Sequence, residues 1–335
     1  MDILLDVGIH REVTAMSNVI LSLRDLRIYY IVKGGFLNLK KNYVKAVDGI
    51  NIDIFEGEAF GIVGESGCGK STTGYGIVGL LKPTEGEILF EGLDISKKST
   101  RGIEFASKVQ IIFQDPYSSL DPRFTVGRSI AEPLVVHKIG NSKSQRERVL
   151  KLMNDVGLHE EQYTKFPHEF SGGQRQRIGI ARAMALDPKL IVCDEPVSAL
   201  DVSIQAQILN LMQELQKKYN LTYVFISHNL SVVEHICDRI AVMYLGNVIE
   251  IAKKRELFDN PKHPYTQALL DAIPIPDPTM KKMQNVLSGD VPSPFNPPSG
   301  CCFHTRCPKA AEKCSTIKPG KTEVADGHFV CCHYI

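Results

Sequence analysis

Short apolar runs alternate with stretches of helical pattern from Val19 to about Asn260, and this alternation is typical of a parallel α/β domain. The runs expected to form strands are Ala59–Val63, Val109–Phe113, Leu190–Cys193, Tyr223–Ile226 and Ile240–Tyr244. The runs at Leu190 and Tyr223 are nearly all apolar, as in strands that are covered on both faces. The expected helices are Lys70–Leu81, Ser171–Ala185 and Ser203–Tyr219.

The pattern changes at two places along the chain. Between Asp115 and Phe170 the strand signal disappears, which predicts a mostly helical insert. After Pro261 many prolines break any long helix, and the chain leads into a cysteine-rich tail. We therefore expect an N-terminal segment over 1–18, a main domain over 19–260 with a helical part at about 115–185, and an extension over 261–335.

Composition and charge narrow the class of protein. Hydrophobic residues make up 43% and charged residues 23% of the chain, as in a globular protein with a full core. The formal net charge of +1 gives no reason to expect a nucleic-acid partner. No apolar run approaches the roughly 18 residues that a membrane span needs, and the N-terminus lacks the apolar stretch of a secretory signal. We expect a cytoplasmic protein that contacts a membrane only through a partner.

A glycine-rich loop follows the first of the buried runs. Its residues are Gly64, Glu65, Ser66, Gly67, Cys68, Gly69, Lys70 and Ser71, which match G-x-x-x-x-G-K-[ST]. Glycines let backbone N–H groups turn inward around phosphates, and the following helix N-terminus adds favourable partial charge. Lys70 is expected to reach the β- and γ-phosphates, and the Ser71 hydroxyl to bind Mg²⁺. The alternative is a glycine-rich turn that only joins a strand to a helix.

Polar side chains follow two further apolar runs. Asp194 and Glu195 end the run that begins at Leu190, about 120 residues after the loop. Asp194 is expected to hold the Mg²⁺ hydration shell, and Glu195 to polarise an attacking water. His228 follows the run at Tyr223 and is expected to hydrogen-bond to the γ-phosphate and Glu195. The plainer interpretations are an ordinary loop start and a structural histidine.

The segment FSGGQRQR from Phe170 to Arg177 contains Ser171, Gly172, Gly173 and Gln174. Ser171 is a favourable N-cap and the glycines leave the next N–H groups unobstructed, so a second anion site is sensible. This segment resembles the signature motif of ABC ATPases. Other elements of that family follow the same resemblance: Gln114 is similar to the Q-loop glutamine, Ser198–Asp201 to the D-loop, and His228 to the switch histidine.

The resemblance implies a P-loop NTPase fold with a RecA-like core, an antiparallel β portion and a helical ABC subdomain, followed by a small cysteine-rich extension. It implies a head-to-tail dimer in which each ATP lies between the loop, with Thr72, of one subunit and the Ser171 region of the other, with Asp201 at the interface. Catalytic roles are implied for Lys70, Gln114, Glu195 and His228, and Mg²⁺ ligation for Ser71, Gln114 and Asp194. Tyr43 is nearest the position of the aromatic that stacks on adenine, with Tyr30 and Phe36 as alternatives.

Two stretches resemble the ATPases of peptide and nickel importers in particular. They are QDPYSSLDPR from Gln114 to Arg123 and HPYTQALL from His263 to Leu270. This similarity implies a peripheral protein at the cytoplasmic face of the membrane. Its partners would be a second ATPase subunit, two permease subunits and an extracytoplasmic substrate-binding protein. Oligosaccharides or nickel are alternative cargoes, and a non-transport ABC ATPase is the alternative class.

Six of the nine cysteines lie in the last 35 residues, and in a reducing compartment such a cluster favours a metal site over disulfides. In relatives with this pattern four cysteines bind a [4Fe–4S] cluster, which implies Cys301, Cys307, Cys314 and Cys332 here, spaced C-x5-C-x6-C-x17-C. Zinc and a metal-free thiol cluster are alternatives. Cys302 and Cys331 are alternative ligands at the two ends.

Overall fold

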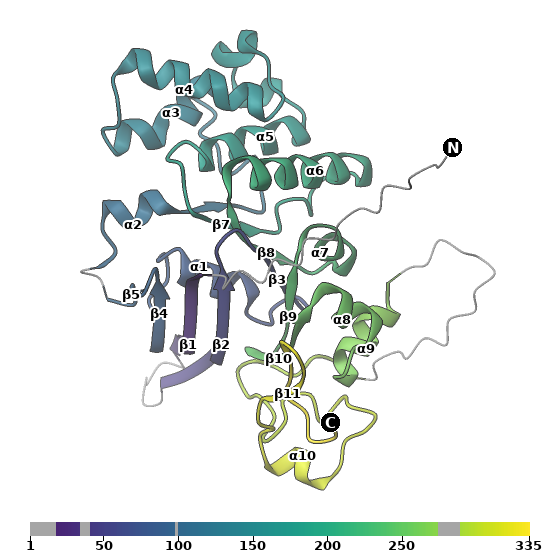
Figure 1. Cartoon of the computed structure of the whole chain (residues 1–335). Coiled ribbons are helices and arrows are strands. Elements are labelled where there is room, and N and C mark those ends of the chain that lie inside the picture. Colours follow the sequence, from purple (N-terminus) through teal and green to yellow (C-terminus); the bar gives the residue numbers. More distant parts are fainter. Residues whose placement is uncertain (1–17, 34–40, 98–99, 274–288) are drawn as a thin grey trace, which may run out of the picture.

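A computed structural model of the chain describes residues 18–33, 41–97, 100–273 and 289–335. Figure 1 shows a helical part, a central part with two sheets, and a small C-terminal part at the opposite end. The strands are β1 (Val19–Lys33), β2 (Lys41–Phe55), β3 (Ala59–Val63), β4 (Glu85–Phe90), β5 (Leu93–Asp94), β6 (Val109–Ile112), β7 (Leu190–Asp194), β8 (Thr222–Ser227), β9 (Arg239–Tyr244), β10 (Asn247–Lys253), β11 (Thr322–Ala325) and β12 (His328–Val330).

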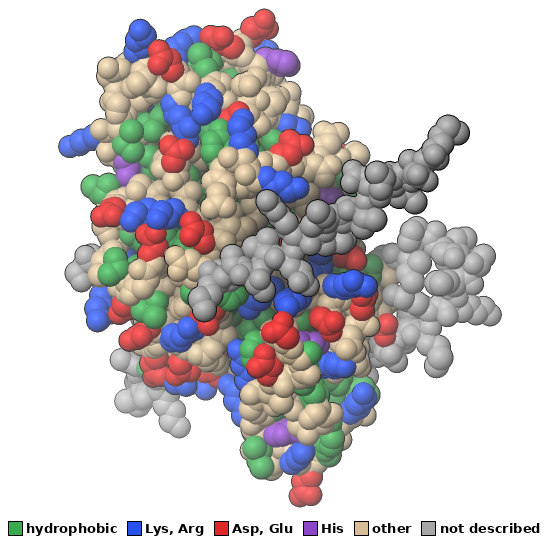
Figure 2. Space-filling model, viewed as in Figure 1, with side chains coloured by type: hydrophobic (Ala, Val, Ile, Leu, Met, Phe, Trp, Pro, Cys, Tyr) green, Lys and Arg blue, Asp and Glu red, His purple; other side chains and the backbone are tan. Residues whose placement is uncertain are grey.

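The helices are α1 (Lys70–Ile77), α2 (Ile103–Lys108), α3 (Val126–Val136), α4 (Ser142–Asp155), α5 (Gly172–Ala183), α6 (Val202–Tyr219), α7 (Leu230–Ile236), α8 (Lys254–Asp259), α9 (Pro264–Asp271) and α10 (Glu312–Thr316), with 3₁₀ turns η2 (Glu160–Thr164) and η3 (Pro167–Glu169). No helix of the described ranges is long and apolar enough to cross a membrane. Basic and acidic side chains are interspersed over the face shown in Figure 2.

The larger sheet has the strand order β11-β12-β10-β9-β3-β8-β7-β6, and its strands β9, β3, β8, β7 and β6 run parallel. Successive residues of these strands enter two different cores, as the two-residue period of a strand requires. In β7, Ile191 and Cys193 belong to the core shared with the helices, whereas Leu190 and Val192 belong to the core shared with β1, β2 and β4. Burial of each of these aliphatic side chains stabilises the folded state by about 1.5–3 kcal/mol. Burial on both faces therefore explains the all-apolar runs in the sequence.

The smaller sheet has the order β2-β1-β4-β5 and is antiparallel, as the resemblance implied. Between β6 and β7 the described chain forms helices and turns, which confirms the expected helical part. Helices α3, α4 and α5 pack together there, and α5 also contacts β6 (Figure 1). Thr125 caps α3 and Asn141 caps α4 through their side chains, so both helices begin at residues that favour N-caps.

Several expected element ends differ from the structure by a few residues. The helix expected to reach Leu81 ends at Ile77, because Gly79 has a positive φ of 78°. Ser171 is the N-cap of α5 and lies outside the helix proper.

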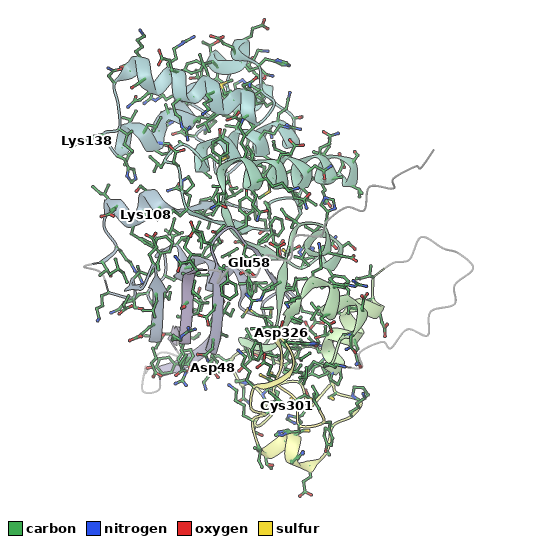
Figure 3. The ribbon with its side chains drawn as sticks, viewed as in Figure 1. Asp48, Glu58, Lys108, Lys138, Cys301 and Asp326 are labelled. Carbon is green, nitrogen blue, oxygen red and sulfur yellow. The ribbon has the colours of Figure 1, made fainter. Side chains whose placement is uncertain are left out.

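The tail contains two strands that the sequence pattern did not predict. Strand β12 pairs with β10 through Glu250 opposite Val330 and Ile251 opposite Phe329. Strand β12 has only 3 residues and β11 only 4, too few for a periodic signal. The extension thus continues the main sheet, with Asp326 beside β10 and Cys301 further out (Figure 3).

Candidate functional site

The loop Gly64–Ser71 follows β3 and includes the first two residues of α1, and it packs closely against two other strands. A Cβ atom at Gly64 would lie 2.2 Å from the Met243 carbonyl oxygen, and one at Gly69 would lie 2.1 Å from that of Ala46. Both glycines also have positive φ values, 154° and 105°. A side chain at either position would therefore clash with backbone and strain the turn. The backbone of this loop is held by β2 and β9 as well as by its own sequence.

Lys70 lies inside this loop, where its side chain is buried. Its Nζ donates to the carbonyl oxygens of Gly64 at 2.8 Å and Glu65 at 3.0 Å. The ammonium group is thus held beside the backbone that is expected to enclose phosphates. Cys68, in the same loop, is buried, and burial raises the pKa of its thiol.

Ser71 and Asp194, two expected Mg²⁺ ligands, lie together. The Ser71 hydroxyl donates to Asp194 Oδ1 at 2.8 Å, and Asp194 is buried at the carboxyl end of β7. A hydroxyl and a carboxylate are oxygen ligands of the kind that Mg²⁺ prefers. Tyr75, which the sequence did not single out, lies beside them. Burial and the Asp194 carboxylate raise the pKa of Tyr75 to about 12.

Glu195 lies between Gln114 and His228, the two other polar side chains expected at the ends of the parallel strands. Gln114 Nε2 donates to Glu195 Oε2 at 2.9 Å, and His228 Nδ1 lies 2.9 Å from Glu195 Oε1. These residues follow β6, β7 and β8, which are neighbouring parallel strands, and carboxyl ends of parallel strands meet at one edge. Glu195 also has a positive φ of 47°, a conformation that costs about 1–3 kcal/mol in residues other than glycine. The structure therefore holds this carboxylate in a fixed place.

The two segments expected at the dimer interface lie at the N-termini of two different helices, α5 and α6. The D-loop-like segment Ser198–Asp201 follows Glu195 closely, and the Glu195 carbonyl oxygen accepts a hydrogen bond from the Ser198 hydroxyl at 3.0 Å. Asp201 is exposed and is the N-cap residue of α6. Ser171 and Gln174 form a reciprocal capping box at the exposed start of α5.

Gly172 and Gly173 open helix α5, and a Cβ at Gly173 would lie 2.5 Å from Ile204 Cγ2. Within the described ranges, no hydrogen bond joins the Ser171–Gln174 segment to the phosphate loop. The segment and the loop thus remain two separate parts of the surface in one chain.

Three aromatic residues, Tyr43, Tyr30 and Phe36, are the candidates for stacking on adenine. Tyr43 is 44% exposed and Tyr30 is 42% exposed. The hydroxyl oxygen of Tyr30 lies 3.4 Å from Thr72 Oγ1, close to the start of α1. Phe36 lies outside the described residues.

The four tail cysteines of the expected cluster lie near one another. Burial raises the pKa of the Cys301 thiol, and the neighbouring thiols of Cys314, Cys307 and Cys332 raise it further. The Cys301 N–H also donates to the Cys314 carbonyl oxygen at 2.7 Å. Over the described ranges, however, no three or more His, Cys, Asp or Glu side chains have the arrangement of a metal site. The expected iron–sulfur site is not confirmed.

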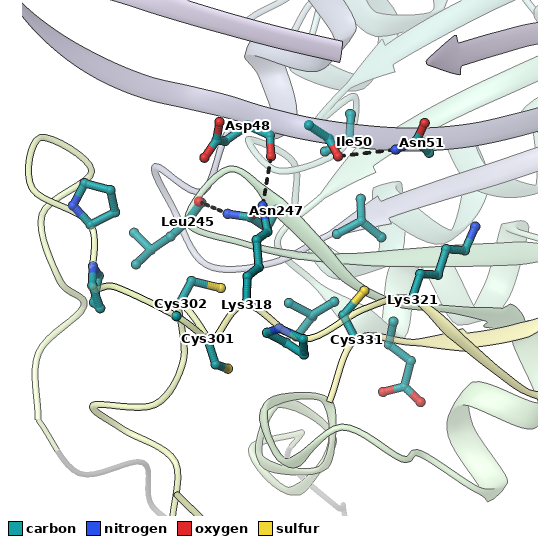
Figure 4. Close-up of a pocket in the computed structure, with 18 of the residues that line it drawn as sticks. Asp48, Ile50, Asn51, Leu245, Asn247, Cys301, Cys302, Lys318, Lys321 and Cys331 are labelled. Carbon is teal, nitrogen blue, oxygen red and sulfur yellow. Dashed lines mark hydrogen bonds between the residues drawn. The ribbon is translucent and has the colours of Figure 1, made fainter. Parts of the chain in front are cut away.

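Cys302 and Cys331 face a different environment. Both line a pocket of about 420 Å³ between the tail and strands β2 and β10, as Cys301 also does. Figure 4 shows their sulfur atoms directed into this pocket, whereas the sulfur of Cys301 points away from that of Cys302. Burial raises the pKa of Cys302 to about 12. Lys318 crosses the pocket and donates to the Asp48 carbonyl oxygen at 3.5 Å.

Comparisons with known proteins agree with this geometry. A family model described as ABC transporter matches residues 47–198, and one described as oligopeptide/dipeptide transporter, C-terminal region, matches residues 249–314. The chain is similar in fold to a dimeric ATP-binding cassette in a post-hydrolysis state with ADP and phosphate. That match has a TM-score of 0.62 and 30% identity and covers 70% of this chain and 99% of the other.

Full-length relatives give the same assignment. The chain is 53% identical to the oligopeptide transport ATP-binding protein AppF of Bacillus subtilis, over 95% of this chain and 98% of that protein. It is 49% identical to the oligopeptide transport ATP-binding protein OppF of Salmonella typhimurium, over 95% and 96% of the two chains. This protein therefore belongs to the family of ABC transporter ATP-binding proteins.

Proposed function

We propose that this chain is the subunit that hydrolyses ATP to energise uptake of dipeptides or oligopeptides through an ABC importer. As a member of its family the chain is an ATPase. The observation that carries the proposal is the position of Glu195 between Gln114 and His228, next to the Ser71–Asp194 pair. The peptide cargo is supported by the printed names of the relatives and by the match to the peptide-transporter C-terminal region.

Each polar group at the strand edge has a proposed role. The N–H groups of Gly64–Thr72 and the Lys70 ammonium bind the phosphates of ATP. Ser71, Asp194 and Gln114 hold Mg²⁺, which when bound neutralises charge on the phosphates. Glu195 orients the attacking water and accepts its proton, and His228 orients Glu195 and contacts the γ-phosphate. The short contacts of Glu195 with Gln114 and His228 support these roles.

The proposed working unit is a dimer of ATPase subunits, formed by two copies or by this chain and a related one. Ser171, Gly172, Gly173 and Gln174 complete the nucleotide site of the opposite subunit, and Asp201 lies at the interface. Exposure of the capped start of α5 supports this arrangement, because its free N–H groups are available to an anion. Tyr43 is the proposed adenine-stacking residue, with Tyr30 as the alternative.

We further propose the partners of this dimer, its cellular location and the domain boundaries of the chain. Its partners are two permease subunits and an extracytoplasmic substrate-binding protein, and the chain is peripheral at the cytoplasmic face of the membrane. Membership of the chain in the family of ABC transporter ATP-binding proteins supports these partners. Residues 19–260 form the ATPase domain, with its helical subdomain at about 115–185, and residues 261–335 form the extension.

In the extension, Cys301, Cys307, Cys314 and Cys332 are the proposed ligands of a structural [4Fe–4S] cluster, with zinc as the alternative. Beyond the effect of burial, Cys314 and Cys332 lie close enough to Cys301 and Cys307 to raise the pKa of both of those thiols, which supports this set, since thiolates suit either metal site. The sulfur atoms of Cys302 and Cys331 are directed into the pocket, whereas that of Cys301 points away from that of Cys302, which supports leaving Cys302 and Cys331 out.

The test is uptake by the assembled transporter in proteoliposomes supplied with ATP and Mg²⁺. Radiolabelled tripeptide, an oligosaccharide and nickel are compared as cargoes. We expect ATP-dependent uptake of the peptide, abolished by Lys70→Ala and retained in the control Lys143→Ala, which changes an exposed lysine of α4. Uptake of sugar or nickel without peptide would contradict the cargo, and normal uptake in Lys70→Ala would contradict the nucleotide site.

A further inference from the structure

Two residues of the C-terminal extension contact the phosphate loop. The Arg306 guanidinium forms a bidentate ion pair with the Glu65 carboxylate, at 2.8 Å from Nη1 to Oε2 and 3.2 Å from Nη2 to Oε1. Only 7% of the Arg306 side chain is exposed, against 27% of Glu65. Such paired, shielded hydrogen bonds fix geometry better than an exposed ion pair. The contact joins residues 241 positions apart in the sequence.

Tyr265 contacts the same loop residue from another direction. Its hydroxyl oxygen accepts the backbone N–H of Glu65 at 3.0 Å, and the side chain is fully buried at the start of α9. Glu65 is thus fixed by its side chain through Arg306 and by its backbone through Tyr265. Because Glu65 is the second residue of the phosphate loop, both contacts act directly on the path of that loop.

Aromatic packing makes this support rigid. The rings of Tyr244, Tyr265 and Phe303 contact one another, with centroid separations of 4.8 to 5.3 Å. Tyr244 ends β9 next to Met243, against whose carbonyl group Gly64 packs. The Arg306 guanidinium carbon lies 5.9 Å from the centre of the Tyr244 ring. The strand end, the extension and the phosphate loop therefore form one packed unit.

We propose that Arg306 and Tyr265 are positioning residues for ATP binding: they fix Glu65 and so hold the phosphate loop in the shape that receives the nucleotide. The extension is then part of the nucleotide site. This inference rests on the assignment of Gly64–Ser71 as the phosphate loop. The loop binds phosphates in both the ground state and the transition state. Loss of its support therefore weakens ATP binding more than the hydrolysis step.

The test is the steady-state hydrolysis of ATP by the assembled transporter with variants of the full chain. For Arg306→Ala we expect KM for ATP to rise about tenfold, with kcat within about twofold of the wild type. Tyr265→Phe removes the acceptor of the Glu65 N–H group and should raise KM several-fold. Arg306→Lys keeps the charge but not the bidentate geometry and should fall between the wild type and Arg306→Ala.

The matched control is Lys253→Ala. Lys253 also joins the main domain to the extension, through Asp326 at 2.7 Å, but this pair is exposed and does not contact the loop. We expect its KM to equal that of the wild type. To separate positioning from folding, Glu65→Arg combined with Arg306→Glu should recover part of the KM that either single change loses, at an unchanged melting temperature.

An unchanged KM in folded Arg306→Ala, or an equal rise in Lys253→Ala, would overturn the inference. Lys70→Ala separates this failure from that of the proposed function. If Lys70→Ala loses ATP binding while Arg306→Ala is normal, the phosphate loop stands and only the positioning role falls. If Lys70→Ala binds ATP normally, the loop assignment itself falls.

Discussion

The strand-edge site and the cysteine-rich tail place their polar groups in different ways. Gln114, Glu195 and His228 lie within two residues of the ends of neighbouring parallel strands, and hydrogen bonds of 2.9 Å already join them. The four cysteines proposed as cluster ligands lie in loops or a short helix, near one another but without the arrangement of a metal site over the described residues. A buried sheet positions side chains through its backbone, whereas a small loop-rich region depends more on what it binds.

Removal of the His228 side chain is the stronger of two ways to test this comparison. His228→Ala takes away one of the two contacts that orient Glu195. We expect phosphate release to fall about 100-fold, because small displacements of a catalytic group are costly, while ATP still binds. His235→Ala is the control, since this exposed histidine of α7 contacts Asn210 instead. Equal turnover in the two variants would show that the strand edge alone suffices to place Glu195.

Metal analysis of the tail gives the second test. Protein purified without oxygen should contain about four irons and four acid-labile sulfides per chain. Cys307→Ser should lose most of this iron, while Cys302→Ser and Cys331→Ser, on the pocket side, should keep it. In Cys307→Ser we expect ATP turnover at saturating ATP to change only a few-fold. Zinc in place of iron would contradict the iron–sulfur cluster, and equal metal loss in all three variants would contradict the proposed ligand set.

The sequence predicts the strand edge well because each part carries a local signal. The buried runs before Asp194 and His228 are nearly all apolar, and the loop before Lys70 has fixed glycine spacing. These signals give the strand ends, and a parallel sheet then brings them together. The structure confirms the fold that the resemblance implied, including the antiparallel sheet and the helical part.

The contacts of the extension could not be predicted in this way. Arg306 and Glu65 are 241 positions apart, and nothing in either local sequence indicates the partner. Pairing of β12 with β10 joins a strand of only 3 residues to the main sheet. Tyr75 likewise lies in an ordinary helix, and only the fold brings it beside Asp194. Such contacts arise from long-range packing, which a local pattern does not encode.

The most direct test of the whole account is ATP hydrolysis by Glu195→Gln, with bound ATP measured in the same samples. The amide keeps the shape of the side chain but cannot accept the proton of the attacking water. We expect hydrolysis to fall by about 10²–10⁴-fold, with ATP bound and intact, and normal turnover in Glu234→Gln, an exposed position of α7. Turnover like that of the wild type in Glu195→Gln would contradict the role of Glu195 and the mechanism built on it.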